Sequence, residues 1–225
     1  MSVVIGIKTP TGIIMCSDTQ QSHDTEKTLD CPKVFRVGSS GAMLGFTGHT
    51  AYKQHILTAI DEHMNWGHLN YDKEAMQWGQ ELMADIRKRC ATLGPGEVQD
   101  GITLYRFEIL VAVGRYLLYL HGGGYVHLVE DFKAIGCGSA AAGTAYEITL
   151  NIHRQDLYIH HKDETTEELQ AGLNADYQLY FNLAREAVRH AINVVVWCGG
   201  SPHALGTWFS NVFYVGDFDV QVVQP

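Results

Sequence analysis

A serine directly follows the first methionine, and an apolar strand pattern begins at residue 3 with VVIGI. Chain ends are usually loose and polar, so this placement predicts a terminus that is tied into the fold. A serine hydroxyl becomes a nucleophile when a base lies beside it, and a free α-amine, with an ordinary pKa of about 7.7–8.0, is a suitable base. From these residues alone, Ser2 is either a common second residue or a reactive group.

The other residues that could do chemistry give weaker signals. The five cysteines, an odd number without a Cys-x-x-Cys pair, argue against a disulfide framework or a zinc ribbon and favour a reducing cytoplasm. His160-His161 lies in the polar stretch HHKDETTEE, which is more typical of a solvated loop than of a metal site. The stretch GCGSAAAG lacks the third glycine of a dinucleotide-binding loop, and the chain shows no P-loop. We therefore expect neither a metal nor a cofactor.

The composition is that of an ordinary globular protein. The chain has 225 residues, of which 46% are hydrophobic and 18% charged, and this suits a single domain over residues 1–225. A net charge of −9 argues against binding to nucleic acid or to an anionic membrane surface. The sequence shows no signal segment and no apolar run long enough to span a bilayer. These features predict one cytoplasmic domain that binds neither nucleic acid nor membrane.

The first half of the sequence predicts two hairpins followed by two helices. Strand patterns cover residues 2–9, 13–18, 33–37 and 42–48, and the polar stretch 19–30 reads as a loop. Apolar residues recur every four positions from Tyr52 to Met64, which predicts a first helix. A second helix has Trp78, Leu82, Ile86 and Cys90 on one face and stops at Gly94-Pro95.

The second half repeats this order of strands and then helices. Strand patterns cover residues 103–114, 116–130 and 132–136, with a hairpin turn at HGGGY. A helix rich in small residues follows over 136–153, and a long helix is predicted over about 167–193. Strands over 209–215 and 218–224 close the chain. Paired helices between groups of strands predict an α+β fold with two antiparallel sheets sandwiched between two helix layers.

Five segments, in this order, carry a resemblance to a known family: GIKTPTGIIMCSDTQ, PKVFRV, LGFTGHTA, FKAIGCGSAAAG and WCGG. Each is weak alone, but their order and spacing resemble those of the β-type proteasome subunits and of their bacterial relative, the HslV peptidase. These proteins are N-terminal-nucleophile hydrolases with a four-layer αββα sandwich. The chain lacks the N-terminal helical extension of α-type subunits, which favours the β-type.

The resemblance implies a role for four residues. Ser2 falls on the family nucleophile, and removal of Met1 would free its amine to act as the base for its own hydroxyl. Lys33 matches the lysine whose charge lowers the pKa values of that amine and hydroxyl, and Asp18 matches the acid that holds the lysine. Gly45 matches the glycine whose backbone N–H donates to the developing oxyanion.

Other positions depart from the family pattern. Cys137 falls where the family has a serine that hydrogen-bonds the terminal amine, and Ser139 lies close enough to substitute for it. Late in the chain, Val195 and Cys198 replace an aspartate and a serine that also support the amine. Ser2 itself replaces the usual threonine, whose methyl group helps to fix the side-chain rotamer.

Three functions are compatible with this sequence. The first is a self-compartmentalised peptidase: homo-oligomeric stacked rings, with Ser2 facing an internal chamber, hydrolyse unfolded polypeptides that a ring ATPase unfoldase supplies. The second is a non-catalytic subunit of such a ring, which the changes at Val195, Cys137 and Cys198 motivate. The third is an N-terminal-nucleophile amidase or acyl transferase that acts on a small molecule without a chamber. The sequence favours the first, because Asp18, Lys33 and Gly45 are retained.

Overall fold

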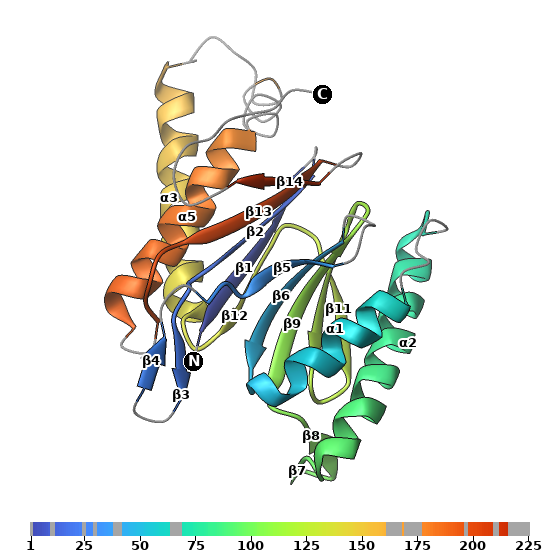
Figure 1. Ribbon diagram of the computed structural model, residues 1–225. Coiled ribbons are helices and arrows are strands. Elements are labelled where there is room, and N and C mark those ends of the chain that lie inside the picture. The colour runs from blue at the N-terminus through green and yellow to red at the C-terminus, as the bar shows by residue number, and fades with distance from the viewer. Residues whose placement is uncertain are drawn as a thin grey trace.

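Two antiparallel sheets lie face to face, and a pair of helices covers the outer side of each (Figure 1). The computed structural model describes residues 2–9, 12–23, 26–28, 31–37, 42–63, 69–160, 168, 177–195, 198–208 and 212–215. The chain start lies between the two halves of this sandwich, at one end of the sheets (Figure 1). The predicted α+β fold with four layers is therefore confirmed.

The first sheet has the strand order β12-β1-β2-β13-β14, so its central strands come from opposite ends of the sequence. Its strands are β1 (Val3–Lys8), β2 (Gly12–Ser17), β12 (Phe132–Gly136), β13 (His203–Trp208) and β14 (Val212–Val215). The register places Val3 opposite Gly136 on one side and Val4 opposite Ser17 on the other. The first residues of the chain thus lie between β12 and β2.

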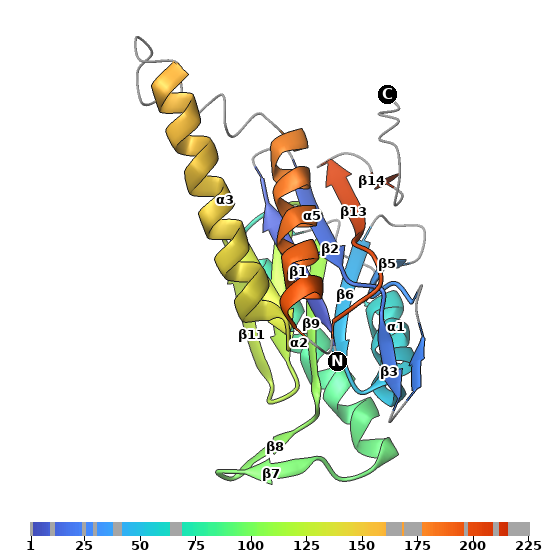
Figure 2. The ribbon, with the colours of Figure 1, turned by 90° about the vertical axis from the view of Figure 1, so that its left-hand side faces the viewer.

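The second sheet has the order β11-β10-β9-β6-β5. Its strands are β5 (Val34–Val37), β6 (Ala42–Gly48), β9 (Phe107–Val113), β10 (Tyr116–His121) and β11 (Tyr125–Val129). Two small hairpins lie outside both sheets: β3 (Gln21–His23) with β4 (Glu26–Thr28), and β7 (Glu97–Gln99) with β8 (Ile102–Leu104). The β7–β8 hairpin projects from the end of the molecule (Figure 2).

Within the part of the chain that the structure describes, the outer layers are formed by α1 (Lys53–Glu62), α2 (Asp72–Cys90), α3 (Ser139–His160) and α5 (Tyr177–Val194). Short 3₁₀ turns precede α1 (Thr50–Tyr52) and follow α2 (Ala91–Leu93). The predicted apolar face of α2 is confirmed, since Trp78, Leu82, Ile86 and Cys90 are all buried. Acidic residues in the first turn of α2 and basic residues in its last turn suit the helix dipole. Among the described residues, no helix is long and apolar enough to cross a bilayer.

Three apolar cores hold the four layers together. One lies between α1, α2 and the second sheet, and another lies between α3, α5 and the first sheet. The third fills the space between the sheets and includes Val4, Met15, Met43, Leu110 and Leu117, all of them fully buried. Because both faces of each sheet are buried, strands such as β9 read as continuous apolar runs rather than alternating ones.

The structure differs from the predicted elements in several places. The stretch 19–30, predicted as a loop, contains the β3–β4 hairpin. This hairpin lies outside both sheets and lacks the alternation of apolar and polar residues by which strands are predicted. The predicted strand 103–114 is divided between β8 and β9 by Tyr105 and Arg106. Strand β13 was missed, because a glycine interrupts its short apolar pattern. Residues 167–176 of the predicted last helix, apart from 168, and the predicted strand 218–224 lie outside the described residues.

Candidate active site

The carboxylate of Asp18 is fully buried and joins three chain segments. Its Oδ1 accepts hydrogen bonds from Lys33 Nζ at 2.9 Å and from the backbone N–H of Val3 at 2.9 Å. Its Oδ2 accepts a hydrogen bond from the N–H of Gly199 at 3.2 Å. One carboxylate oxygen therefore holds both the Lys33 ammonium and the residue that follows Ser2.

Lys33 is held rigidly at this point, with 8% of its surface exposed. Its Nζ also donates to the backbone oxygen of Asp18 at 3.0 Å, and its own backbone oxygen accepts from Phe46 N–H at 2.9 Å. Burial lowers the pKa of Lys33, and the neighbouring Asp18 carboxylate opposes that effect. The result is a desolvated cation whose field acts strongly on nearby groups.

Ser2 lines a cavity although only 8% of its surface is exposed. Its backbone oxygen accepts from Gly138 N–H at 3.4 Å and from the Cys137 thiol at 3.4 Å. These contacts come from the turn between β12 and α3. The predicted tie between the chain start and the fold is confirmed, because β1 and this turn hold both sides of Ser2.

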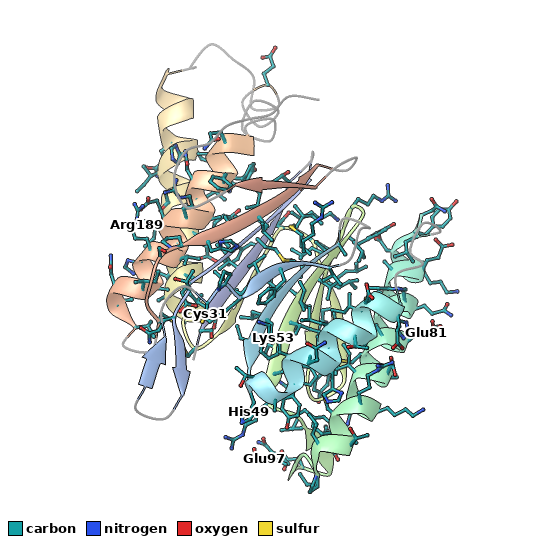
Figure 3. The ribbon with its side chains drawn as sticks, in the orientation of Figure 1. Cys31, His49, Lys53, Glu81, Glu97 and Arg189 are labelled. Carbon is teal, nitrogen blue, oxygen red and sulfur yellow. The ribbon has the colours of Figure 1, made fainter. Side chains whose placement is uncertain are left out.

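The cavity has a volume of about 520 Å³, and Ser2 forms part of its wall. The end of β6 contributes Thr47 and Gly48 to its lining, the next residue contributes His49, and the β12–α3 turn contributes Cys137. Glu97 and other residues at the base of the β7–β8 hairpin form another wall, and Figure 3 shows His49 and Glu97 at the same end of the molecule. The cavity can therefore bring a bound molecule to the Ser2 hydroxyl. Among the described residues, no cluster of His, Cys, Asp and Glu could hold a metal ion.

Comparison with known proteins agrees with this arrangement. A sequence model described as the proteasome subunit matches residues 2–160, which include Ser2, Asp18 and Lys33. The chain belongs to the proteasome subunit family. No curated protein matches it.

Solved structures share the fold at low sequence identity. Eukaryotic HslV from Trypanosoma brucei is 17% identical with a TM-score of 0.59, over 92% of this chain and 99% of that one. BPH from Thiobacillus denitrificans is 18% identical with a TM-score of 0.60, over 92% of this chain and 98% of that one. The same BPH in complex with epoxomicin is 17% identical with a TM-score of 0.59, over the same shares. These solved structures therefore share the αββα sandwich over nearly the whole length of this proteasome-family chain.

Of the two glycines in the LGFTGHTA segment, the structure brings Gly48 to the cavity and leaves Gly45 inside the sheet. His49 N–H donates to the backbone oxygen of Arg106, next to β9, at 2.9 Å. Because the amides of a strand point alternately to its two edges, the N–H of Gly45 also faces β9. Gly45 lies opposite Leu110 of that strand. Gly48 N–H faces the opposite edge of β6, toward β5. The N–H of Phe46 faces the same edge and donates to the backbone oxygen of Lys33. Gly48 has φ of 127°, which favours glycine.

Gly45 has a packing role that predicts a loss of stability on substitution. A Cβ at this position would lie 2.6 Å from Val4 Cγ1 in the core between the sheets. Gly45→Ala is expected to lower the free energy of unfolding by about 1–3 kcal/mol through overpacking, measured by denaturant titration. Gly143→Ala in α3 is the matched control, since its Cβ would lie 3.8 Å from the Phe132 ring, an ordinary contact. Equal stability of the Gly45 variant and the wild type would contradict this packing.

Ser139 and Val195, two positions that the family pattern singles out, make no polar contact with Ser2 within the described residues. Ser139 is the first residue of α3, and within the described residues no hydrogen bond joins it to Ser2. Val195 packs against the apolar core between the first sheet and its helices. Neither position supplies a polar contact to the start of the chain.

Sequence reasoning missed Glu108, and it gave no role to Gly199 and Gly200 although both lie in the WCGG segment. Glu108 lines the cavity, accepts from Gly136 N–H at 2.9 Å and from the Tyr119 hydroxyl at 2.8 Å, and so fixes the strand beside Ser2. Gly199 and Gly200 lie so close to Gln20 and Thr19 that a Cβ would approach to about 2 Å of their side chains. A lone glutamate in the apolar strand FEILVAV was the available signal for the first, and the Gly-Gly pair for the second.

Proposed function

We propose that this proteasome-family chain is an N-terminal-nucleophile peptidase, with Ser2 as the nucleophile after removal of Met1. The observation that carries the proposal is the shared Oδ1 of Asp18, which holds Lys33 Nζ and Val3 N–H at 2.9 Å each. Asp18 thus fixes the Lys33 cation beside Val3, the residue next to Ser2. A buried cation at this place favours ionisation of the Ser2 hydroxyl. A purely structural ion pair would not need to lie beside a chain start that lines a cavity.

The reaction follows from these groups. The freed α-amine of Ser2 accepts the proton of the Ser2 hydroxyl while Oγ attacks the substrate carbonyl carbon. Lys33 favours the ionised hydroxyl by its charge, and Asp18 holds Lys33 in place. The tetrahedral intermediate expels the amine product, which takes the proton from the α-ammonium, and leaves an ester on Ser2 Oγ. A water molecule then hydrolyses this ester with the α-amine again acting as base.

Gly48 is the donor that we assign to the oxyanion. Its N–H faces the edge of β6 that is directed toward Lys33, and it lines the cavity together with Ser2. Preorganised backbone donors of this kind stabilise a tetrahedral intermediate strongly. This assignment replaces Gly45, whose N–H faces β9.

Covalent labelling tests the nucleophile. The purified protein is incubated with epoxomicin, an epoxyketone that is bound by the structurally similar BPH, and the adduct is located by peptide mapping. We expect one adduct per chain, on the peptide that begins with Ser2, in the wild type and in Cys137→Ser. An adduct on Cys137 in place of Ser2, or no adduct at all, would overturn the proposal.

The assembly that we propose is a set of homo-oligomeric stacked rings that degrades unfolded polypeptide delivered by a ring ATPase. The family match over residues 2–160 supports it. Light scattering is expected to give a mass many times that of one chain. An active monomer or dimer that hydrolyses a small amide would instead indicate an amidase or acyl transferase.

A second candidate function is a non-catalytic ring subunit. Val195 favours it, because an apolar side chain packed on the core stands where the family carboxylate would support the amine. The two candidates differ in a direct measurement: a homo-oligomer of this chain hydrolyses peptides under the first and does not under the second.

A further inference from the structure

Two cysteines that are 61 positions apart in sequence meet beside Ser2. The Sγ atoms of Cys137 and Cys198 are 3.9 Å apart, and the Cys137 thiol also donates to the backbone oxygen of Ser2 at 3.4 Å. Cys137 lies in the turn between β12 and α3, and Cys198 lies in the segment that leads into β13. Both segments contact the site, since Gly199 N–H donates to Asp18 at 3.2 Å.

The two thiols differ in exposure and in acidity. Cys137 is exposed and lines the cavity, whereas only 5% of the surface of Cys198 is exposed. The hydrogen bond from the Cys198 thiol lowers the pKa of Cys137 to about 6, and the same contact, together with burial, raises the pKa of Cys198. The protonated form of Cys137 donates to Ser2, and its thiolate accepts from Cys198. An accessible cysteine that ionises beside a buried thiol is the arrangement in which the first is oxidised and the second resolves the product.

We propose that Cys137 and Cys198 form a peroxide-oxidisable dithiol that switches the Ser2 site off when it closes to a disulfide. The Sγ atoms have to approach from 3.9 Å to about 2.05 Å, which rotation of the two side chains with a small shift of their turns can provide. The switching effect rests on the proposed function of Ser2, whereas the formation of the disulfide does not.

The chemistry balances with hydrogen peroxide as the oxidant. The Cys137 thiolate attacks one peroxide oxygen, which gives a sulfenic acid at Cys137 and, after protonation, one water molecule. The Cys198 sulfur then attacks the sulfenic sulfur, the S–S bond forms, and the hydroxyl group leaves as a second water molecule. Two hydrogens are lost from the protein. A dithiol reductant reverses the change by thiol–disulfide exchange, as the reducing cytoplasm expected from the sequence would require.

Closing the disulfide is expected to displace the Ser2 backbone. The Cys137 thiol loses its hydrogen bond to Ser2, and the neighbouring Gly138 N–H contact to the same oxygen, at 3.4 Å, has to shift with it. A displacement of about 1 Å at a reacting group costs about a hundredfold in rate. The oxidised protein should therefore label with epoxomicin about a hundredfold more slowly than the reduced protein.

The test is oxidation of the purified protein with hydrogen peroxide, followed by thiol blocking and unreduced peptide mapping. We expect a mass loss of two hydrogens and a cross-linked peptide pair that contains Cys137 and Cys198, both reversed by dithiothreitol. In Cys198→Ser the sulfenic acid at Cys137 should persist and react with dimedone, whereas Cys31→Ser, the matched control, should cross-link like the wild type. Each variant is compared before and after peroxide, so its own starting activity is its reference.

Three outcomes would overturn the proposal. The first is peroxide treatment that oxidises other cysteines without linking this pair. The second is the absence of a dimedone adduct at Cys137 in both Cys198→Ser and Cys198→Ala. The third is a complete cross-link with an unchanged rate of epoxomicin labelling. A protein that never labels with epoxomicin but still forms the cross-link would contradict the proposed function and the switch, while leaving the disulfide site established.

Discussion

Replacing Ser2 with alanine is expected to lower the peptidase activity of the assembled protein at least about a thousandfold, because removal of a nucleophile removes the covalent pathway. Alanine is small, like serine, so removal of Met1 should proceed and the variant should differ from the wild type only in its hydroxyl. Ser2 is held mainly through its backbone, by Gly138 N–H and Cys137, so the fold should be retained. Steady-state hydrolysis of an unstructured peptide measures the effect.

The control for this variant removes a hydroxyl far from the site. Thr149 lies in α3, where its Oγ1 donates to Ala145 O at 2.8 Å. Thr149→Ala should keep the activity of the wild type within about a factor of two. Activity of Ser2→Ala close to that of Thr149→Ala would show that another residue is the nucleophile.

Replacing Asp18 with alanine is expected to lower the free energy of unfolding by about 3–5 kcal/mol and to abolish the activity, because it leaves the buried Lys33 cation without its partner. Three hydrogen-bond donors lose an acceptor at once: Lys33 Nζ and the N–H groups of Val3 and Gly199. Denaturant unfolding at a fixed protein concentration measures the stability, and epoxomicin labelling measures the site.

An exposed carboxylate gives the matched control for Asp18. Asp61 is exposed on α1, and Asp61→Ala should change the free energy of unfolding by no more than about 0.5 kcal/mol. An Asp18→Ala variant as stable as Asp61→Ala would mean that the ion pair contributes nothing to the fold, and retained labelling would separate Asp18 from catalysis.

Much of the fold could be predicted because most of its elements carry local signals. The apolar spacing of Trp78, Leu82 and Ile86 and the stop at Gly94-Pro95 define α2 from the sequence alone. Strand β13 and the β3–β4 hairpin were not predicted, since Gly206 interrupts the first and the second lies in a polar stretch without apolar alternation. Their positions depend on pairing with distant strands, which periodicity does not reveal.

The site was predicted in part, through the resemblance to the β-type proteasome subunits rather than through periodicity. Asp18 and Lys33 match the acid and the lysine of that family, and the structure joins them at 2.9 Å. Gly45 and Gly48 are equivalent by residue type, and only the edge that each amide faces and the positive φ of Gly48 separate them. The 3.9 Å contact between Cys137 and Cys198 could not be predicted, because it requires β12 and the segment before β13 to flank the same strands.

The intact mass of the purified, active assembly is the sharpest test of the freed Ser2 amine as the catalytic base, because this amine exists only when Met1 has been removed. We expect every labelled chain to begin at Ser2, and chains that retain Met1 to carry no epoxomicin adduct. An assembly that hydrolyses peptides while all its chains retain Met1 would contradict the account, since an amide nitrogen at Ser2 cannot act as the base for its own hydroxyl.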